Sequence, residues 1–261
     1  MSGLISARVE TGVATLTLDT PSRLNAISLP MWQSLPALVA RADADEHVRV
    51  IALTGAGAKA FSAGADIARF GEERHDTASA RHYDAAVEAA ESALEGARKP
   101  TVALINGLCF GGGMGLALAC DFRLAAAHAQ FRLPPARLGI GYAFAGVERL
   151  ANAIGTAAAA HVLFTAMPFD ADQALAWGLV QQIMPEPSFA ATSAALLHNI
   201  ADNAPLSLLA AKAALRECAK PASERDEASV DAAVARCYES NDYREGRAAF
   251  AEKRKPAFKG D

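Results

Sequence analysis

The chain has 261 residues, of which 52% are hydrophobic and 21% are charged, and its formal net charge is −4. This balance provides enough apolar surface for a sizeable core and excludes an intrinsically disordered chain. The net negative charge, with no long stripe of Lys and Arg, excludes an extended nucleic-acid-binding surface.

The first two-thirds of the chain alternates between strand and helix patterns. Short apolar or alternating runs, which are typical of strands, cover residues 5–9, 13–18, 48–54, 101–105, 122–126 and 129–133. Apolar residues at helical spacing cover residues 28–41, 78–97 and 114–119. Because strand, turn and helix recur in this order, we expect an α/β fold with parallel strands that opens with an antiparallel hairpin.

The last third has a helical pattern, apart from one short strand expected at residues 179–183. Helical spacing recurs over residues 170–177, 188–203, 206–219, 223–239 and 242–253. No repeat or low-complexity linker separates the two parts, and Pro185-Glu186-Pro187 is the best candidate for a joint. We therefore predict an α/β core over residues 1–185 and a helical C-terminal region over residues 186–261.

Metal binding, export and membrane insertion are not expected. The start of the chain lacks the basic and apolar blocks of a secretory signal. Asn106 and five glycines interrupt the uncharged run from Pro100 to Cys120, which favours a buried strand–turn–helix over a membrane span. The four cysteines lack metal-ligand spacing, so we expect reduced, buried thiols in a cytoplasmic protein. They are Cys109, Cys120, Cys218 and Cys237.

Two glycine-rich loops each follow a predicted strand. The first reads TGAGAKAFSAGADI over residues 54–67, and the second reads GLCFGGGMGLALACDF over residues 107–122. Backbone N–H groups at a helix N-terminus point outward and favour negative charge. One N–H group from each loop would form a two-donor oxyanion hole for a carbonyl oxygen that gains negative charge. Tight packing between helix and strand would account for one or two of these glycines, but not for two loops of them.

A nicotinamide-binding loop is the alternative for the first of these segments. Gly55 to Ala60 read GAGAKA, which fits the dinucleotide pattern GxGxx(G/A) after a strand. That pattern binds a dinucleotide only where a helix with an apolar face begins at the loop. Polar residues follow here instead, so the oxyanion hole is favoured.

Segments along nearly the whole chain resemble the enoyl-CoA hydratase/isomerase family, which has the crotonase fold: Leu24–Ala26, Phe61–Ile67, Lys99–Ala125, Ala174–Val180 and Ser240–Phe258. The resemblance implies a crotonase-like spiral of ββα units with a helical C-terminal trimerisation region. It also implies homotrimers, or hexamers built as dimers of trimers. The implied substrate is an acyl-CoA that itself carries the coenzyme A, with no separate cofactor and no metal. In this family two backbone N–H groups hold the thioester enolate, and here they fall on Ala65 and Gly112.

The same resemblance implies where the substrate binds. Positions that contact coenzyme A or the acyl group in the family fall on Arg23, Leu24, Lys59, Ala63, Asp66, Ile67, Phe250 and Lys253. The cations among them suit the phosphates of coenzyme A, and Phe250 matches an aromatic residue near the adenine. The acyl pocket is expected to include Phe70, Tyr83 and Phe144.

The residues that usually move protons in this family are replaced. The two glutamates of the hydratases fall on Gly115 and Pro135, and a third acidic position falls on Ala143. General acid–base groups contribute about 10²–10⁴-fold each, and none of these three residues is such a group. Ordinary hydration by the family mechanism is therefore not expected.

Decarboxylation needs no general base, so a decarboxylase-type lyase is the specific reaction that we expect. Tyr142 matches a tyrosine of the methylmalonyl-CoA decarboxylases, which the tail of the chain also resembles. Its hydroxyl would orient the departing carboxylate, although a packing role beside the acyl tunnel is equally open. Two alternatives remain: a hydratase or isomerase with a displaced acid at Glu148, and a non-catalytic acyl-CoA binder.

Overall fold

The computed structural model describes residues 4–261, with the side chain of Phe70 left out, and contains two β-sheets. The large sheet has the order β1-β2-β3-β5-β7-β10. Its strands are β1 (Leu4–Glu10), β2 (Val13–Asp19), β3 (Val50–Gly55), β5 (Thr101–Ile105), β7 (Phe122–Ala126) and β10 (Gln182–Met184). The hairpin β1–β2 is antiparallel, and each later neighbour in the sheet is parallel. The expected hairpin and parallel core are thus confirmed.

A small sheet collects one short strand after each of three strands of the large sheet. Its order is β4-β6-β8-β9, with strands β4 (Ala60–Ser62), β6 (Leu108–Phe110), β8 (Gln130–Arg132) and β9 (Phe169–Asp170). The first three are parallel to one another, and β9 is antiparallel to β8. The units β3–β4–α3, β5–β6–α4 and β7–β8–α5 therefore repeat one pattern of two strands and a helix.

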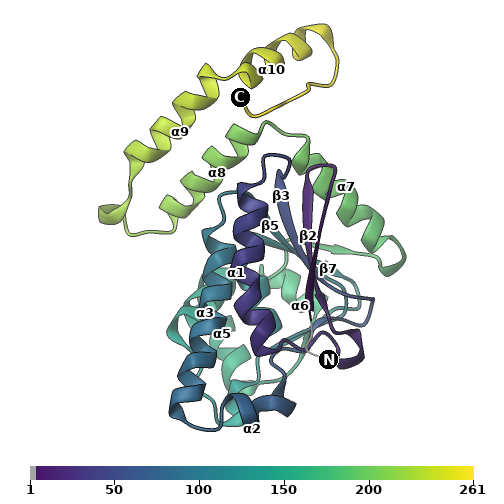
Figure 1. Ribbon diagram of the computed structural model, residues 1–261, viewed down its shortest axis with the longest axis vertical. Coiled ribbons are helices and arrows are strands. Elements are labelled where there is room, and N and C mark those ends of the chain that lie inside the picture. The colour runs from purple at the N-terminus through teal and green to yellow at the C-terminus, as the bar shows by residue number, and fades with distance from the viewer. Residues whose placement is uncertain (1–3) are drawn as a thin grey trace.

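Helices cover both faces of the large sheet. The helices are α1 (Leu29–Ala44), α2 (Phe70–Glu73), α3 (Thr77–Gly96), α4 (Gly112–Ala119), α5 (Phe144–Thr165), α6 (Ala171–Ala176), α7 (Phe189–Ala201), α8 (Pro205–Cys218), α9 (Glu227–Glu239) and α10 (Asn241–Glu252). Figure 1 shows α1, α3 and α5 beside one face and α7 beside the other. Since side chains alternate along a strand, Ile51 and Leu53 of β3 enter the core under α1 and α3, whereas Val50 and Ala52 face α7.

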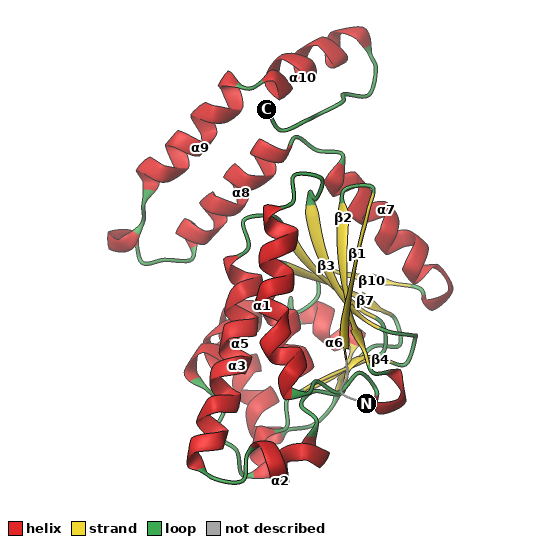
Figure 2. Cartoon of the chain, viewed as in Figure 1, coloured by secondary structure: helices red, strands yellow, loops and turns green. Residues whose placement is uncertain are grey.

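The C-terminal helices form a separate layer at one end of the molecule. Figure 2 shows α8, α9 and α10 at the top, far from β4 and α2 at the bottom. Lys212 of α8 joins this layer to the α/β part, and only 4% of the residue is exposed. Its Nζ lies 2.8 Å from Asp121 Oδ2 and donates a hydrogen bond of 2.8 Å to Lys99 O.

The sequence misplaced several smaller features. The strands β4, β6 and β9 and the helix α2 have two to four residues each, which is too short for a period to show. Cys109 and Cys120 are buried as expected, but Cys218 is exposed at the end of α8 and Cys237 is only half-buried on α9. Within residues 4–261 no helix is long and apolar enough to cross a membrane.

Replacement of Lys212 by Ala should lower the free energy of unfolding by about 2–3 kcal/mol, as measured by urea denaturation. Loss of one partner of a fully buried ion pair costs about 3–5 kcal/mol, but the Asp121 side chain keeps 33% exposure to water. The control is Lys220→Ala, which breaks an exposed pair with Glu217 and should change stability by less than about 0.5 kcal/mol. Equal effects of the two variants would contradict the joining role of Lys212.

Candidate active site

The two glycine-rich loops lie in direct contact. Gly64, in the loop after β4, has φ +93°, which a residue with a side chain rarely adopts. A Cβ atom there would lie 2.8 Å from Phe110 O and 3.1 Å from Gly112 N. Only a residue without a side chain lets the two backbones approach this closely.

Two backbone N–H groups at this contact have no acceptor. Ala65 forms an isolated parallel bridge with Ile27, in which Ile27 N donates to Gly64 O at 2.8 Å and Asp66 N donates to Ile27 O at 3.1 Å. The N–H group of Ala65 itself therefore points to the other edge of its segment. Gly112 is the first residue of α4, where the helix offers its N–H no acceptor. Within the described part of the chain, neither group donates a hydrogen bond.

These two donors are neighbours in space. A Cβ atom built on Gly112 would lie 3.7 Å from Ala65 N and 2.8 Å from Cζ2 of Trp32. Trp32 is 1% exposed and donates from Nε1 to the Tyr83 hydroxyl at 2.9 Å, so its ring is fixed beside Gly112. The arrangement of two unused N–H groups next to a buried indole suits a carbonyl oxygen that gains negative charge.

Close contacts between the two loops account for more of the glycines than expected. A Cβ atom at Gly113 would lie 2.7 Å from Ser62 Cβ, and one at Gly107 would overlap Lys59 O. With Gly64, at least three glycines are therefore required by contact between the two loops. The expectation that packing accounts for one or two was wrong, because the small sheet presses β4 and β6 together.

The acyl-pocket residues do not gather as expected. Tyr83 is 1% exposed, behind Trp32, and burial raises the pKa of its hydroxyl to about 12. Phe144, the first residue of α5, is 78% exposed. The side chain of Phe70 lies outside the described part of the structure. Tyr83 therefore holds Trp32 beside Gly112 and is too deeply buried to line an open acyl pocket.

A glutamate from another helix occupies the space beside Gly115. The helices α3 and α4 pack together, and a Cβ atom at Gly115 would overlap Oε1 of Glu91 and lie 3.2 Å from its Cδ. The same Cβ atom would lie 3.7 Å from the Tyr142 hydroxyl. The residue Glu91 is 5% exposed, and Arg149 of α5 donates from Nη1 to its Oε2 at 2.7 Å. A carboxylate thus lies where a side chain at residue 115 would begin.

The surroundings of Glu91 favour its neutral form. Burial is the largest influence and raises the pKa of this carboxyl group to about 7, while the Arg149 guanidinium lowers it and Glu88 and Glu95 raise it. The pKa of the Tyr142 hydroxyl lies well above its usual value, first because of burial and second because of the Glu91 carboxylate. Both protonation states of Glu91 are therefore present near neutral pH.

Glu91 could not be recognised as a site residue from its sequence context. It lies in a polar, alanine-rich helix between Glu88 and Glu95, and the spacing alone indicates only a solvated face. Tyr142, which was expected in the site, does lie beside Gly115. Glu148, the expected displaced acid, is instead exposed on α5, and its neighbour Arg149 points toward α3.

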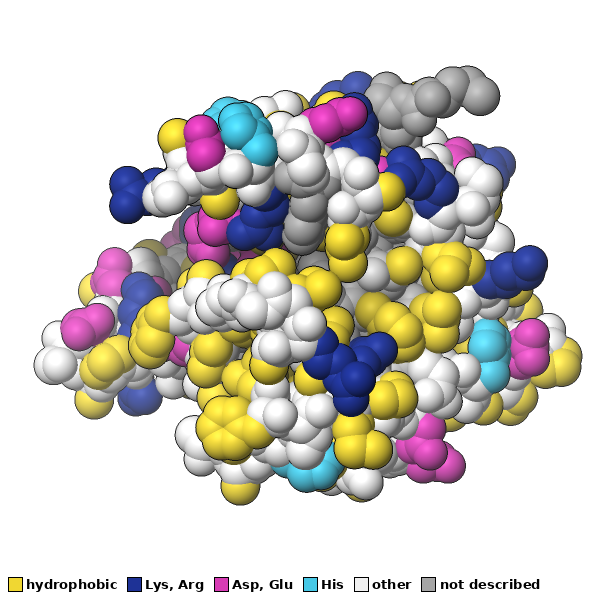
Figure 3. Space-filling view, turned by 90° about the horizontal axis from the view of Figure 1, so that it is seen from below, with side chains coloured by type: hydrophobic (Ala, Val, Ile, Leu, Met, Phe, Trp, Pro, Cys, Tyr) yellow, Lys and Arg dark blue, Asp and Glu magenta, His cyan; other side chains and the backbone are white. Residues whose placement is uncertain are grey.

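Most of the expected coenzyme A residues lie in two segments that run side by side. Ala63 N donates to Leu24 O at 2.8 Å, and Arg23 forms an ion pair with the buried Asp66. Leu24 and Ile67 leave apolar surface exposed, at 36% and 53%. Figure 3 looks at the end of the molecule that carries β4 and α2, and hydrophobic side chains gather there with Lys and Arg between them. Lys59 is exposed just before β4.

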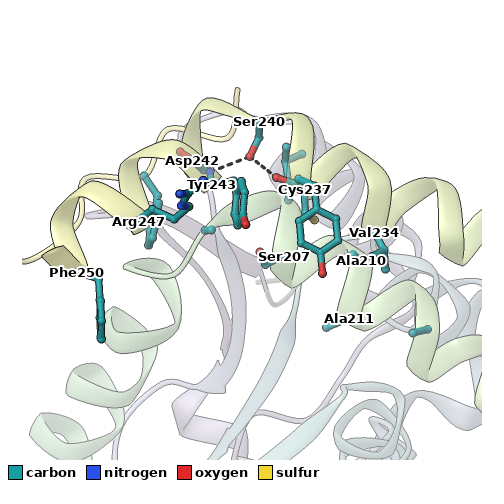
Figure 4. Close-up of a pocket in the computed structure, with 16 residues that line it drawn as sticks. Ser207, Ala210, Ala211, Val234, Cys237, Ser240, Asp242, Tyr243, Arg247 and Phe250 are labelled. Atoms are coloured by element: carbon teal, nitrogen blue, oxygen red, sulfur yellow. Dashed lines mark hydrogen bonds between the residues drawn. The ribbon is translucent and has the colours of Figure 1, made fainter.

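Phe250 and Lys253 lie elsewhere in the chain. Both belong to the end of α10, at the opposite end of the molecule from β4 (Figure 2). Phe250 is 88% exposed and borders a cavity of about 820 Å³ between α8, α9 and α10, which Figure 4 shows. Val234, Tyr243 and Phe258 also line this cavity. One chain therefore does not bring the eight expected residues to one ligand.

The nicotinamide alternative fails on local structure. Residues 55–60 lead into β4, which begins at Ala60, and no helix begins there. The helix dipole and N-terminal N–H groups that would hold a pyrophosphate are absent from this described loop.

A family model described as enoyl-CoA hydratase/isomerase matches residues 8–261. The chain belongs to this family. It is 32% identical over 243 residues to the short-chain-enoyl-CoA hydratase of Clostridium acetobutylicum, covering 93% of this chain and 92% of that protein. It is 34% identical over 252 residues to the carnitinyl-CoA dehydratase of Salmonella arizonae, covering 95% of each. The solved structure of an enoyl-CoA hydratase/carnithine racemase from Magnetospirillum magneticum matches with a TM-score of 0.92 and 35% identity, covering 98% of this chain and 96% of that one. The expected crotonase-like fold is confirmed.

Proposed function

We propose that this chain is an enzyme that acts on an acyl-CoA thioester through an enolate. The observation that carries the proposal is the pair of unused, adjacent N–H groups of Ala65 and Gly112. Membership of the family, together with relatives named for acyl-CoA substrates, supports the substrate class. The coenzyme A arrives as part of the substrate.

The two donors act on the thioester carbonyl oxygen. When a bond at the α-carbon breaks, its electron pair moves into the new carbon–carbon double bond, and negative charge collects on this oxygen. Preformed donors stabilise that charge without reorganisation, and loss of one such donor costs about 10²–10³-fold in rate. The N-terminus of α4 adds a favourable dipole at the same point.

We propose decarboxylation of a malonyl-type thioester as the specific reaction. The bond between the α-carbon and the carboxylate breaks, carbon dioxide leaves, and the electron pair passes to the enolate held at Ala65 and Gly112. This step requires no general base, which fits the absence of an acid at Gly115, Pro135 and Ala143. The Tyr142 hydroxyl, beside Gly115, orients the departing carboxylate.

Reversible hydration is the second candidate, and two observations favour it. The relatives named above are a hydratase and a dehydratase. The buried carboxylate of Glu91 lies beside Gly115, where hydratases of the family carry a glutamate. Both candidate reactions pass through an enolate, and in both the α-carbon takes up a proton.

We propose that the complete coenzyme A site forms between copies of this chain, in a homotrimer or a hexamer. Phe250 and Lys253 lie far from Arg23 and Lys59 within one chain, so a second copy must supply them to the same ligand. Exposed apolar side chains on α8, α9 and α10 provide the contact surface: Leu215, Val234, Tyr238, Tyr243 and Phe250.

Substitution of Gly112 by Pro should lower kcat/KM for the true substrate at least about 10²-fold more than substitution by Ala. Both variants place a Cβ atom against Trp32, but only Pro removes the N–H donor. Circular dichroism checks that both variants fold. Equal activity of the Pro and Ala variants would show that the Gly112 N–H group is not an oxyanion donor.

A panel of crotonyl-, malonyl-, methylmalonyl- and 3-hydroxybutyryl-CoA decides between the two reactions. We expect carbon dioxide release from a malonyl-type thioester, and the Tyr142→Phe variant should lower kcat about 10–150-fold. A hydrogen bond to a charged group contributes about 1.5–3 kcal/mol, and this variant removes one hydroxyl with little change in volume. If no substrate releases carbon dioxide and crotonyl-CoA is hydrated, the reaction is hydration and not decarboxylation. Binding without turnover of any thioester would indicate a non-catalytic binder.

Sedimentation velocity should give a mass three or six times the 27.2 kDa of one chain. The double variant Phe250→Ser/Tyr238→Ser should dissociate, because these side chains are 88% and 64% exposed in one chain. The control Leu4→Ser changes an equally exposed apolar residue on β1 and should keep the wild-type mass. A monomeric wild-type protein would contradict the shared site.

A further inference from the structure

We propose that Glu91 is the catalytic acid–base that moves the proton at the α-carbon of the substrate. The inference rests on the proposed enolate chemistry and adds the group that this chemistry otherwise lacks. Gly115 of α4 has no side chain, and the carboxylate of Glu91 on α3 fills the space beside it.

The two oxygens of Glu91 have different surroundings. Oε2 accepts a hydrogen bond of 2.7 Å from Arg149, whereas Oε1 lies against Gly115 and, within residues 4–261, accepts none. Gly115 follows Gly112 by three residues, so the two lie about 4.5 Å apart along the axis of α4. A thioester α-carbon is two bonds from its carbonyl oxygen. With this oxygen at Gly112, the α-carbon lies within one helical turn of Glu91.

A purely structural ion pair with Arg149 does not explain why Glu91 is buried. Arg149 carries one positive charge but contacts three carboxylates of α3, Glu88, Glu91 and Glu95. The side chains of Glu88 and Glu95 are 46% and 56% exposed, so Arg149 has two well-solvated partners without Glu91. The side chain of Glu91 is 6% exposed, and its burial carries a desolvation cost that the ion pair with Arg149 does not require.

Glu91, the enolate and water account for every bond made and broken in the proton transfer. After the enolate forms, the O–H bond of neutral Glu91 breaks, its proton joins the α-carbon, and the enolate electron pair forms the new C–H bond. The carbonyl is restored, and the Glu91 carboxylate remains beside Arg149 until it takes a proton from water. In reverse, the Glu91 carboxylate removes an α-proton. A carboxyl group with pKa about 7 serves in both directions near neutral pH.

The test is uptake of deuterium at carbon 2 of butyryl-CoA in deuterium oxide, followed by mass spectrometry. This saturated thioester has nothing to hydrate or decarboxylate, so the readout reports α-proton transfer alone. The Glu91→Gln variant should lose exchange at least about 10²-fold and should bind butyryl-CoA with unchanged Kd. The control Asp84→Asn makes the same charge change at an exposed position of α3 and should exchange at the wild-type rate.

A second set of variants moves the carboxylate from residue 91 to residue 115 and uses the same deuterium readout. Gly115→Glu alone introduces a Cβ atom that overlaps Glu91 Oε1, so the Glu91 carboxylate must move away from Gly115 and exchange should fall. The double variant Glu91→Ala/Gly115→Glu removes that overlap and returns a carboxylate to the same space, so exchange should recover to at least about a tenth of the wild-type rate. A merely structural role for Glu91 predicts no recovery.

The pH profile gives a readout that loss of structure would not move. Proton removal requires ionised Glu91, so wild-type exchange should rise with pH through about 7. The groups that face Glu91 are Glu88 and Glu95 on α3, Arg149 on α5 and Tyr142 before it, whereas α4 presents only Gly115. The Arg149 guanidinium favours the ionised form, so Arg149→Gln should move the midpoint to higher pH.

Each outcome supports or overturns the assignment. Wild-type exchange in Glu91→Gln, or no exchange in a wild-type protein that binds butyryl-CoA and converts another thioester, overturns the role of Glu91 and leaves the proposed function intact. Failure of the wild-type protein to bind butyryl-CoA or convert any thioester overturns both. Loss in Glu91→Gln with recovery in the double variant supports the assignment.

Discussion

The contact between the loop after β4 and the turn before α4 fixes the geometry of the candidate site. Gly64 allows the backbones to approach until Phe110 O and Gly112 N lie within 3.1 Å of where its Cβ would be. The parallel register of β4, β6 and β8 presses the loops together, and the bridge to Ile27 turns Ala65 N outward. Two donors from segments almost fifty residues apart in sequence thereby meet, and neither has an acceptor among residues 4–261.

A second feature of the site is that two helices supply its groups. The helix α4 provides an N–H group at Gly112 and a bare backbone at Gly115, and α3 uses that space to hold Glu91. Arg149 on α5 limits the rise in the pKa of this carboxyl group, which burial alone would take further. The fold thus keeps a carboxylate beside Gly115, at the position on α4 that itself has no acidic side chain. The absence of a glutamate at residue 115 therefore does not leave this space without a carboxylate.

The sequence predicted what depends on local pattern. The hairpin, the buried strand TVALI and the helices α1, α3 and α7–α10 follow from alternation, apolar runs and helical spacing, and the family motifs pointed to Ala65 and Gly112. Glu91 was out of reach, because its position depends on how α3 packs on α4 and on the missing side chain at Gly115. The position of Phe250 was equally hidden, since a motif identifies a residue and not its place in the fold. Tyr83 was misassigned because its hydrogen bond to Trp32 has no trace in either segment.

A crystal structure with bound acetoacetyl-CoA would show whether Ala65 and Gly112 form an oxyanion hole. We expect the thioester oxygen to lie about 2.7–3.1 Å from both Ala65 N and Gly112 N, the range of a working oxyanion hole. We also expect carbon 2 of the ligand to face the space shared by Gly115 and Glu91. A thioester oxygen that contacts neither N–H group, with the acyl chain bound elsewhere, would rule out both assignments.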